Sequence, residues 1–171
     1  MMLKKISLFF LIFLLTSAFV GFDAYGAEEG NSSIPSESYH NEKGLSHFKN
    51  GFYNFAPKHK KEEAWKEYGL AIQEYNKALV INPDYAEAHR NLARVYYVQK
   101  KYLKAAKHYK KLTSLDPYDI DSYLYTASAY EKAQKYDEAI AELEIAKNKT
   151  SNPQIIEKLY SFIEKIEHRR Q

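Results

Sequence analysis

The pattern of apolar and polar positions changes twice along the chain. Residues 6–22 contain no charge and are rich in Phe and Leu, and residues 28–38 are polar with no hydrophobic period. From residue 39 onward, apolar residues recur at steps of three and four, which is the spacing of one face of an α-helix. Only six Gly and five Pro interrupt 171 residues, so the pattern predicts an all-α fold with short connections.

The N-terminal stretch has the layout of a secretory signal peptide. Lys4 and Lys5 precede the uncharged run, and the small residues Ala24 and Gly26 stand at the −3 and −1 positions of a cut before Ala27. Residues 1–26 are therefore predicted to be a cleaved signal peptide, and the mature chain to be periplasmic or secreted. The alternative is an uncleaved anchor, for which residues 6–22 are short, because a span needs about 20 residues.

The amino-acid composition limits which kinds of catalytic and metal sites the chain can form. The chain has no Cys, which excludes disulfides, thiolate catalysis and Cys-ligated metals. Residues 27–38 contain too few apolar groups to offset the entropy of ordering and are predicted to be a flexible linker.

Similar residues recur at a fixed offset of 34 in the remaining chain. The recurring types are Ala, Tyr and Pro. Ala suits a close crossing of two helices, Tyr fills the space beside that crossing, and Pro suits the end of a helix. The matched residues are Ala71, Ala105 and Ala139, Ala93 and Ala127, Tyr96 and Tyr130, and Pro83 and Pro117.

This pattern resembles the tetratricopeptide repeat family, whose unit is a helix–turn–helix of 34 residues. The resemblance implies an α-solenoid of about three repeats, here ending in a solvating helix that closes the stack. The predicted divisions are a first repeat over 39–85 with an insertion at 54–68, a second over 86–119, a third over 120–152, and a capping helix over 153–171.

Local residues predict the details of these elements. The insertion is expected to be a protruding loop beginning at Pro57, followed by a lengthened helix that holds Trp65. Asp84 and Asp119 are expected to cap the helices that follow them, and Asn152 to cap the last. On that last helix the predicted apolar face is made of Ile155, Ile156, Leu159, Tyr160, Ile163 and Ile166.

No constellation for catalysis, a cofactor or a metal is recognisable. The six His include no HExxH pair, and there is no Gly-rich phosphate loop. His89 occupies a packing position and is interpreted as an interhelical histidine. The chain is therefore predicted not to be an enzyme and to need no cofactor.

The basic run 99–111 is a candidate for binding phosphate or anionic lipid. Its lysines are interpreted instead as a solvated outer face whose field is cancelled by the acidic stretch 137–144. With a net charge of only +3, no nucleic-acid partner is expected, and membrane contact is expected only through residues 6–22 if they stay attached.

The resemblance implies that the first helix of each repeat lines a concave binding face. Two Arg there would hold a carboxylate, and aromatic residues would hold an apolar side chain; a solvated Glu87–Arg90 pair is the alternative. The residues predicted to bind a partner are Phe48, Arg90, Asn91, Arg94, Tyr97, Leu124, Ser128 and Glu131.

Family members that act as chaperone adaptors clamp a terminal carboxylate with Lys and Asn. Asn91 fits one clamp position, but Asp121 stands where a cation is required, so chaperone tails are not the expected partner. The predicted function is a non-catalytic scaffold of the cell envelope that binds a protein or peptide. The alternative is a structural subunit that self-associates end to end as a homo-oligomer.

Overall fold

The structure, a computed structural model, describes residues 35–171, and within them every regular element is helical. The predicted signal peptide and the first part of the predicted linker lie outside the described residues. None of the described helices is both long and apolar enough to cross a membrane. The predicted all-α fold is confirmed.

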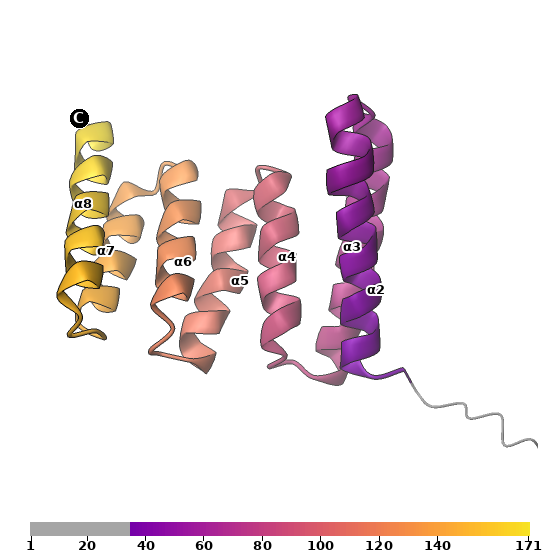
Figure 1. Ribbon diagram of the computed structural model, residues 1–171, viewed down its shortest axis with the longest axis horizontal. Coiled ribbons are helices and arrows are strands. Elements are labelled where there is room, and N and C mark those ends of the chain that lie inside the picture. The colour runs from indigo at the N-terminus through magenta and orange to yellow at the C-terminus, as the bar shows by residue number, and fades with distance from the viewer. Residues whose placement is uncertain (1–34) are drawn as a thin grey trace, which may run out of the picture. The chain divides into compact units, whose positions relative to one another are not determined.

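The helices form antiparallel pairs that follow one another in chain order (Figure 1). Turns within each pair lie at the upper edge of Figure 1, and links between pairs lie at the lower edge. The elements are α2 (Glu37–Lys49), a π-helical segment (Asn50–Phe55), a 3-10 turn (Ala56–Lys58), α3 (Lys61–Ile81), α4 (Ala86–Val98), α5 (Tyr102–Leu115), α6 (Ile120–Lys132), α7 (Tyr136–Lys147) and α8 (Pro153–Arg170).

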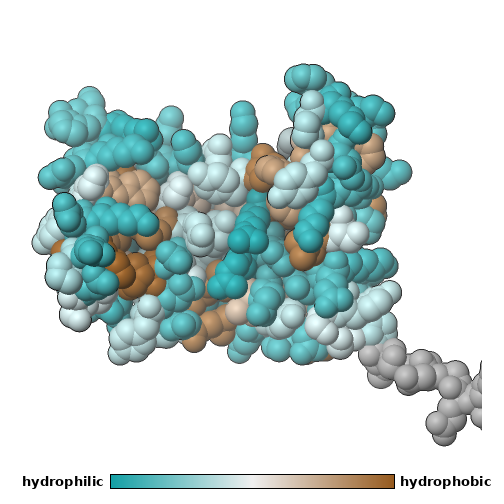
Figure 2. Space-filling view, viewed as in Figure 1, coloured by the Kyte–Doolittle hydropathy of each residue, from teal (hydrophilic) through white to brown (hydrophobic). Residues whose placement is uncertain are grey.

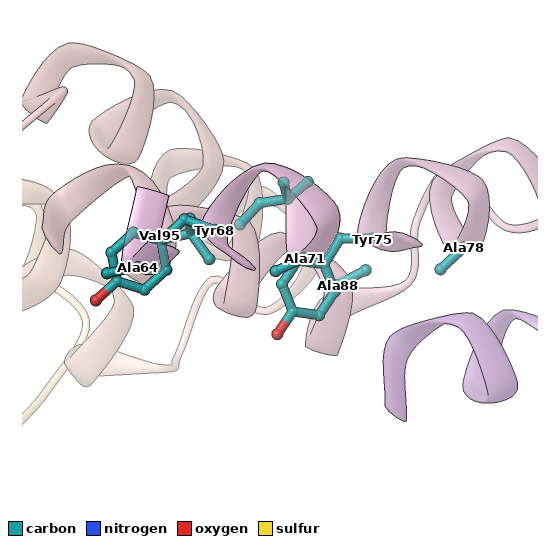
Figure 3. Packing of buried hydrophobic residues seen from close by; sticks show 8 residues of the cluster. Ala64, Tyr68, Ala71, Tyr75, Ala78, Ala88 and Val95 are labelled. Atoms are coloured by element: carbon teal, nitrogen blue, oxygen red, sulfur yellow. The ribbon is translucent and has the colours of Figure 1, made fainter. Parts of the chain in front are cut away.

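Small residues lie at the closest helix crossings, as the offset of 34 predicts. Ala93, Ala105, Ala127 and Ala139 are all fully buried. Large residues fill the space beside them, and Figure 3 shows Tyr68 and Tyr75 of α3 on either side of Ala71. Because the core is close-packed, these alanines set how near the helices approach.

The first helix pair is longer than the other two, and this corrects the sequence prediction for its insertion. The predicted protruding loop is instead helical: α2 runs on through the π-helical segment, Pro57 lies in the 3-10 turn, and α3 begins at Lys61. The extra residues therefore lengthen both helices of the hairpin. The linker boundary also moves, because Ser36 caps α2 and helix starts at Glu37.

Two of the three predicted caps are confirmed. The Asp119 side chain accepts from the Ser122 backbone N–H, and that of Asn152 accepts from Gln154 and Ile155. Asp84 was predicted wrongly, because α4 begins one residue later and the Asp84 carboxylate instead lies 2.8 Å from Nζ of Lys111.

Helix α8 covers the last pair with Leu159, Ile163 and Ile166, all buried. Tyr160 was expected on this apolar face but is half exposed. Its ring lies under the ammonium of Lys147, with Nζ 4.5 Å from the ring centroid. A cation over an aromatic face is an alternative to burial for a tyrosine.

Candidate functional site

A hollow of about 400 Å³ opens between the first and second helix pairs. We call it the aromatic hollow, because five of its seven lining residues are Phe or Tyr. It is lined by Phe48, Phe52, Tyr53, Arg94, Tyr97, Val98 and Tyr109. On the face seen in Figure 2, apolar surface is visible near the upper end of α4 within a polar surround.

Ring contacts hold the walls of the aromatic hollow in place. Phe48 stacks on Phe52 with centroids 5.7 Å apart, and Phe52 meets Tyr53 edge-on at 5.0 Å. On the other wall, the Tyr97 ring meets Tyr102 edge-on at 5.2 Å. Such contacts orient the rings without closing the hollow.

Arg94 is the only cation that lines the hollow. Its side chain is exposed, and within residues 35–171 it forms no ion pair. Burial raises the pKa of the Tyr109 hydroxyl to about 12, and the nearby positive charge of Arg94 opposes that rise. The Tyr109 hydroxyl is therefore neutral, and the guanidinium is available to an incoming anion.

Arg90 was predicted to act together with Arg94, but the structure separates their roles. The Arg90 guanidinium lies 3.7 Å from a carboxylate oxygen of Asp119. The expected alternative, a pair between Glu87 and Arg90, is not formed among the described residues. Arg90 thus links α4 to the start of α6 and does not line the aromatic hollow.

Two further predicted site residues, Asn91 and Glu131, form polar contacts with other residues of the chain. Asn91 is buried and donates a hydrogen bond of 2.9 Å to Asn41 Oδ1. The Glu131 carboxylate is buried and accepts from the Arg169 guanidinium at the end of α8. Neither residue is therefore part of the candidate site.

The remaining predicted residues lie on α6. The Ser128 hydroxyl is 3.2 Å from the Tyr97 hydroxyl and so positions that ring. Leu124 is partly buried and packs on the cluster that α6, α7 and α8 share. Of the eight predicted residues, Phe48, Arg94 and Tyr97 line the aromatic hollow.

Four lining residues were not predicted: Phe52, Tyr53, Val98 and Tyr109. Phe52 and Tyr53 come from the π-helical segment, which the repeat pattern does not contain. Tyr109 belongs to a second helix, which was expected to face away from the binding side. The unusual density of Phe and Tyr over 48–55 was the available clue.

The predicted interhelical role of His89 is confirmed. Its Nε2 lies 3.0 Å from the Pro83 carbonyl oxygen, and its Nδ1 lies 3.0 Å from Nδ1 of His108. Among residues 35–171, no group of three or more His, Asp and Glu is placed to hold a metal ion.

Two sequence models match the central part of the chain. One, described as TPR repeat, matches residues 66–100, and another, described as tetratricopeptide repeat, matches residues 86–119. Residues 66–119 are tetratricopeptide repeats. No curated protein sequence matches it.

Solved tetratricopeptide repeat domains have the same fold. The TPR domain of Arabidopsis OM64 is 19% identical, with a TM-score of 0.55, over 76% of this chain and 95% of that one. The Sgt2 TPR domain from Aspergillus fumigatus is 19% identical, with a TM-score of 0.54, over 78% of each chain. The first TPR domain of Spaghetti (RPAP3), bound to the HSP90 peptide SRMEEVD, is 21% identical, with a TM-score of 0.51, over 75% of this chain and 94% of that one.

The two sequence matches end at residue 119, yet the repeat continues beyond them. Lys100 and Gln134, which are 34 residues apart, follow the first helices of successive repeats, and their φ angles are 59° and 60°. The α6–α7 pair thus reproduces the turn geometry of the matched α4–α5 repeat.

Proposed function

We propose that residues 35–171 form a non-catalytic interaction module that binds a segment of a partner protein in the aromatic hollow. The observation that carries the proposal is Arg94, an exposed cation without an ion-pair partner in the described chain, beside the rings of Phe48 and Tyr97. Aromatic and Arg side chains together are enriched where interfaces gain most of their affinity.

The chemistry of the aromatic hollow specifies the segment. Its rings can contact one bulky apolar side chain of the partner. Arg94 can donate two hydrogen bonds to a carboxylate that lies a few ångströms from that side chain. The RPAP3 domain, solved with an acidic peptide, supports such a ligand for the tetratricopeptide fold. The partner is thus an acidic segment that includes one large apolar residue.

The N-terminal sequence supports a place for this module outside the cytoplasm. A charged start, an uncharged run over 6–22 and small residues at 24 and 26 are typical of exported proteins. We place the module in the cell envelope, where it gathers partner proteins.

Self-association end to end is the alternative function. The outer surface of α8 is rich in exposed charges, including Glu157, Lys158, Glu164 and Lys165, and charged residues are depleted from the centres of stable interfaces. A mass in solution that stays constant with concentration is expected. A mass that rises with concentration would favour the structural subunit.

Selection from a displayed library of random peptides tests the binding function. We expect the protein to enrich peptides with an acidic residue near a large apolar one. Arg94→Glu should weaken an enriched peptide by about 2 kcal/mol or more in fluorescence anisotropy. Lys158→Glu makes the same charge change on α8 and should leave affinity unchanged. Equal losses from both variants, or no enrichment by the wild type, would contradict the proposal.

A further inference from the structure

One edge of the helix stack concentrates lysines that have no ion-pair partner. This edge contains the turns within the three helix pairs, at the top of Figure 1. We call it the lysine edge; its exposed lysines outside every ion pair of residues 35–171 are Lys58, Lys61, Lys100, Lys101, Lys104 and Lys132.

The lysine edge is continuous from the first helix pair to the third. Nζ of Lys101 lies 5.5 Å from the ring centroid of Trp65, which joins the α4–α5 turn to the start of α3. A shallow hollow lined by residues 100–104 and Ala133 then joins this turn to the α6–α7 turn. The lysines therefore form one surface and not three separate tips.

The sequence predicted that the acidic stretch of α7 would cancel this charge, but its acids are paired with other basic residues. Each of the four acids has its own basic partner, and none of these partners is one of the six unpaired lysines. The pairs are Asp137 with Arg170, Glu138 with Lys135, Glu142 with Lys110 and Glu144 with Lys147. Of the acids near α3's start, Glu63 lies 4.0 Å from Lys60, and Glu62 forms no pair in residues 35–171.

The opposite edge has fewer unpaired lysines. The α5–α6 link and the first turn of α6 contain Asp116, Asp119 and Asp121 and no basic residue over 116–121, although Asp119 is paired with Arg90 and the exposed Lys149 lies in the α7–α8 link. The unpaired lysines are therefore concentrated on one side of the stack, although the whole chain has a net charge of only +3. A charge separated in this way orients the molecule toward an anionic surface.

Apolar side chains project between the lysines. Trp65 is 42% exposed and Leu103 is 54% exposed. Trp has an apolar ring and a polar N–H, so it suits the boundary between water and lipid. Leu103 gains nothing from a polyanion in water but gains from contact with acyl chains.

We propose that the lysine edge docks on the surface of an anionic lipid bilayer. All six unpaired cations are Lys, which acts as a mobile point charge, whereas specific pairing with one carboxylate favours the planar fork of Arg. Lipid headgroups present diffuse negative charge, and each Lys close to such a surface adds to the attraction. In this orientation the links between helix pairs lie on the side away from the bilayer.

Emission from Trp65, the only tryptophan in the chain, tests the proposal on the full-length protein. Vesicles of phosphatidylcholine with about 30% phosphatidylserine should shift the emission to the blue, and raised salt should reverse the shift. Vesicles of phosphatidylcholine alone should leave it unchanged. Because the emission reports this edge, contact of another part of the chain with lipid does not imitate the result.

A pair of charge-reversal variants gives the control. Lys100→Glu with Lys104→Glu should lower the partition onto anionic vesicles about tenfold or more, and circular dichroism shows whether the helices persist. Lys158→Glu with Lys165→Glu makes the same change on α8 and should leave the Trp65 shift intact. Equal losses from both pairs, an equal shift with neutral vesicles, or no shift with anionic ones would overturn the proposal. Saturable binding of polyglutamate without binding of vesicles would also overturn it, in favour of an acidic protein.

Discussion

The ring of Tyr75 on α3 occupies the space into which a Cβ atom on Gly44 of α2 would project. A Cβ built at Gly44 lies 2.6 Å from Cε1 of Tyr75. The contact recurs along the same two helices, where a Cβ at Gly51 lies 2.8 Å from Cε1 of Tyr68. Both tyrosines are buried, so the two glycines set how closely α3 packs on α2 and the π-helical segment, which together provide Phe48, Phe52 and Tyr53 to the aromatic hollow.

Gly44→Ala should therefore destabilise the protein by about 1–3 kcal/mol, because a methyl group at a tight crossing forces the rings or helices apart. Gly69→Ala is the matched control, since a Cβ there has no heavy atom within 4 Å. It should stabilise α3 by about 0.5–1 kcal/mol through helix propensity. Urea unfolding measures both, and shifts of the same sign would contradict the close crossing.

The repeat period predicted the parts of the fold that depend on residue size. Ala93 and Ala127 could be placed at helix crossings from sequence, because a close approach tolerates only small residues and both helices repeat with the same offset. The lengthened first hairpin could not be placed, because its extra residues break the period. Pro57 indicated a loop, yet a 3-10 turn accommodates proline near its start.

The candidate site was harder to predict than the fold. The period indicates which residues share a helix face, but it does not indicate which distant residue approaches them. Asn91 and Glu131 lie on the expected helices, and their partners Asn41 and Arg169 are 50 and 38 residues away. Such pairings depend on the stacking of whole helices, so exposure could not be deduced from position in the repeat.

Gln134→Gly should stabilise the protein by about 0.5–1 kcal/mol. Gln134 directly follows the C-cap of α6 and has a φ of 60°, a left-handed conformation that costs energy for any residue with a Cβ and suits glycine. Lys132→Gly, at the last residue of α6, should instead destabilise the protein by up to about 1 kcal/mol, because glycine has a low helix propensity. Thermal melting of the two variants compares them, and a loss from Gln134→Gly would show that the glutamine side chain has a stabilising contact.

Stability should fall as the pH drops from about 6.5 toward 4, because of His108. Burial, followed by the charges of His89 and Lys107, lowers the pKa of His108 from 6.5 to about 4. Between these values the unfolded chain binds a proton and the folded chain does not, so acid favours unfolding by up to about 3 kcal/mol. Urea titrations at a series of pH values measure the effect.

His108→Phe should flatten that pH dependence. The Phe ring keeps the stacking that His108 makes with Tyr96 at 5.6 Å but has no proton to bind. His168→Gln, at an exposed histidine near the end of α8, should leave the slope unchanged. If stability depends on pH as steeply in His108→Phe as in the wild type, groups other than His108 cause the acid sensitivity. The Glu74 carboxyl, whose pKa is lowered to about 2, would affect stability only in stronger acid.

Phe52→Ser should weaken peptide binding more than it weakens the fold. Phe52, in the π-helical segment, lines the aromatic hollow and is 39% exposed. Its ring packs on those of Phe48 and Tyr53. If a partner's apolar side chain enters there, loss of the ring should cost about 1–2 kcal/mol of binding free energy. Tyr39→Ser removes a comparably exposed ring from α2 outside the hollow and should leave affinity unchanged. Anisotropy titrations with one selected peptide decide between the outcomes. Equal affinities for both variants would move the apolar contact from the π-helical wall to the α4 wall, where Tyr97→Ala would then be the damaging change.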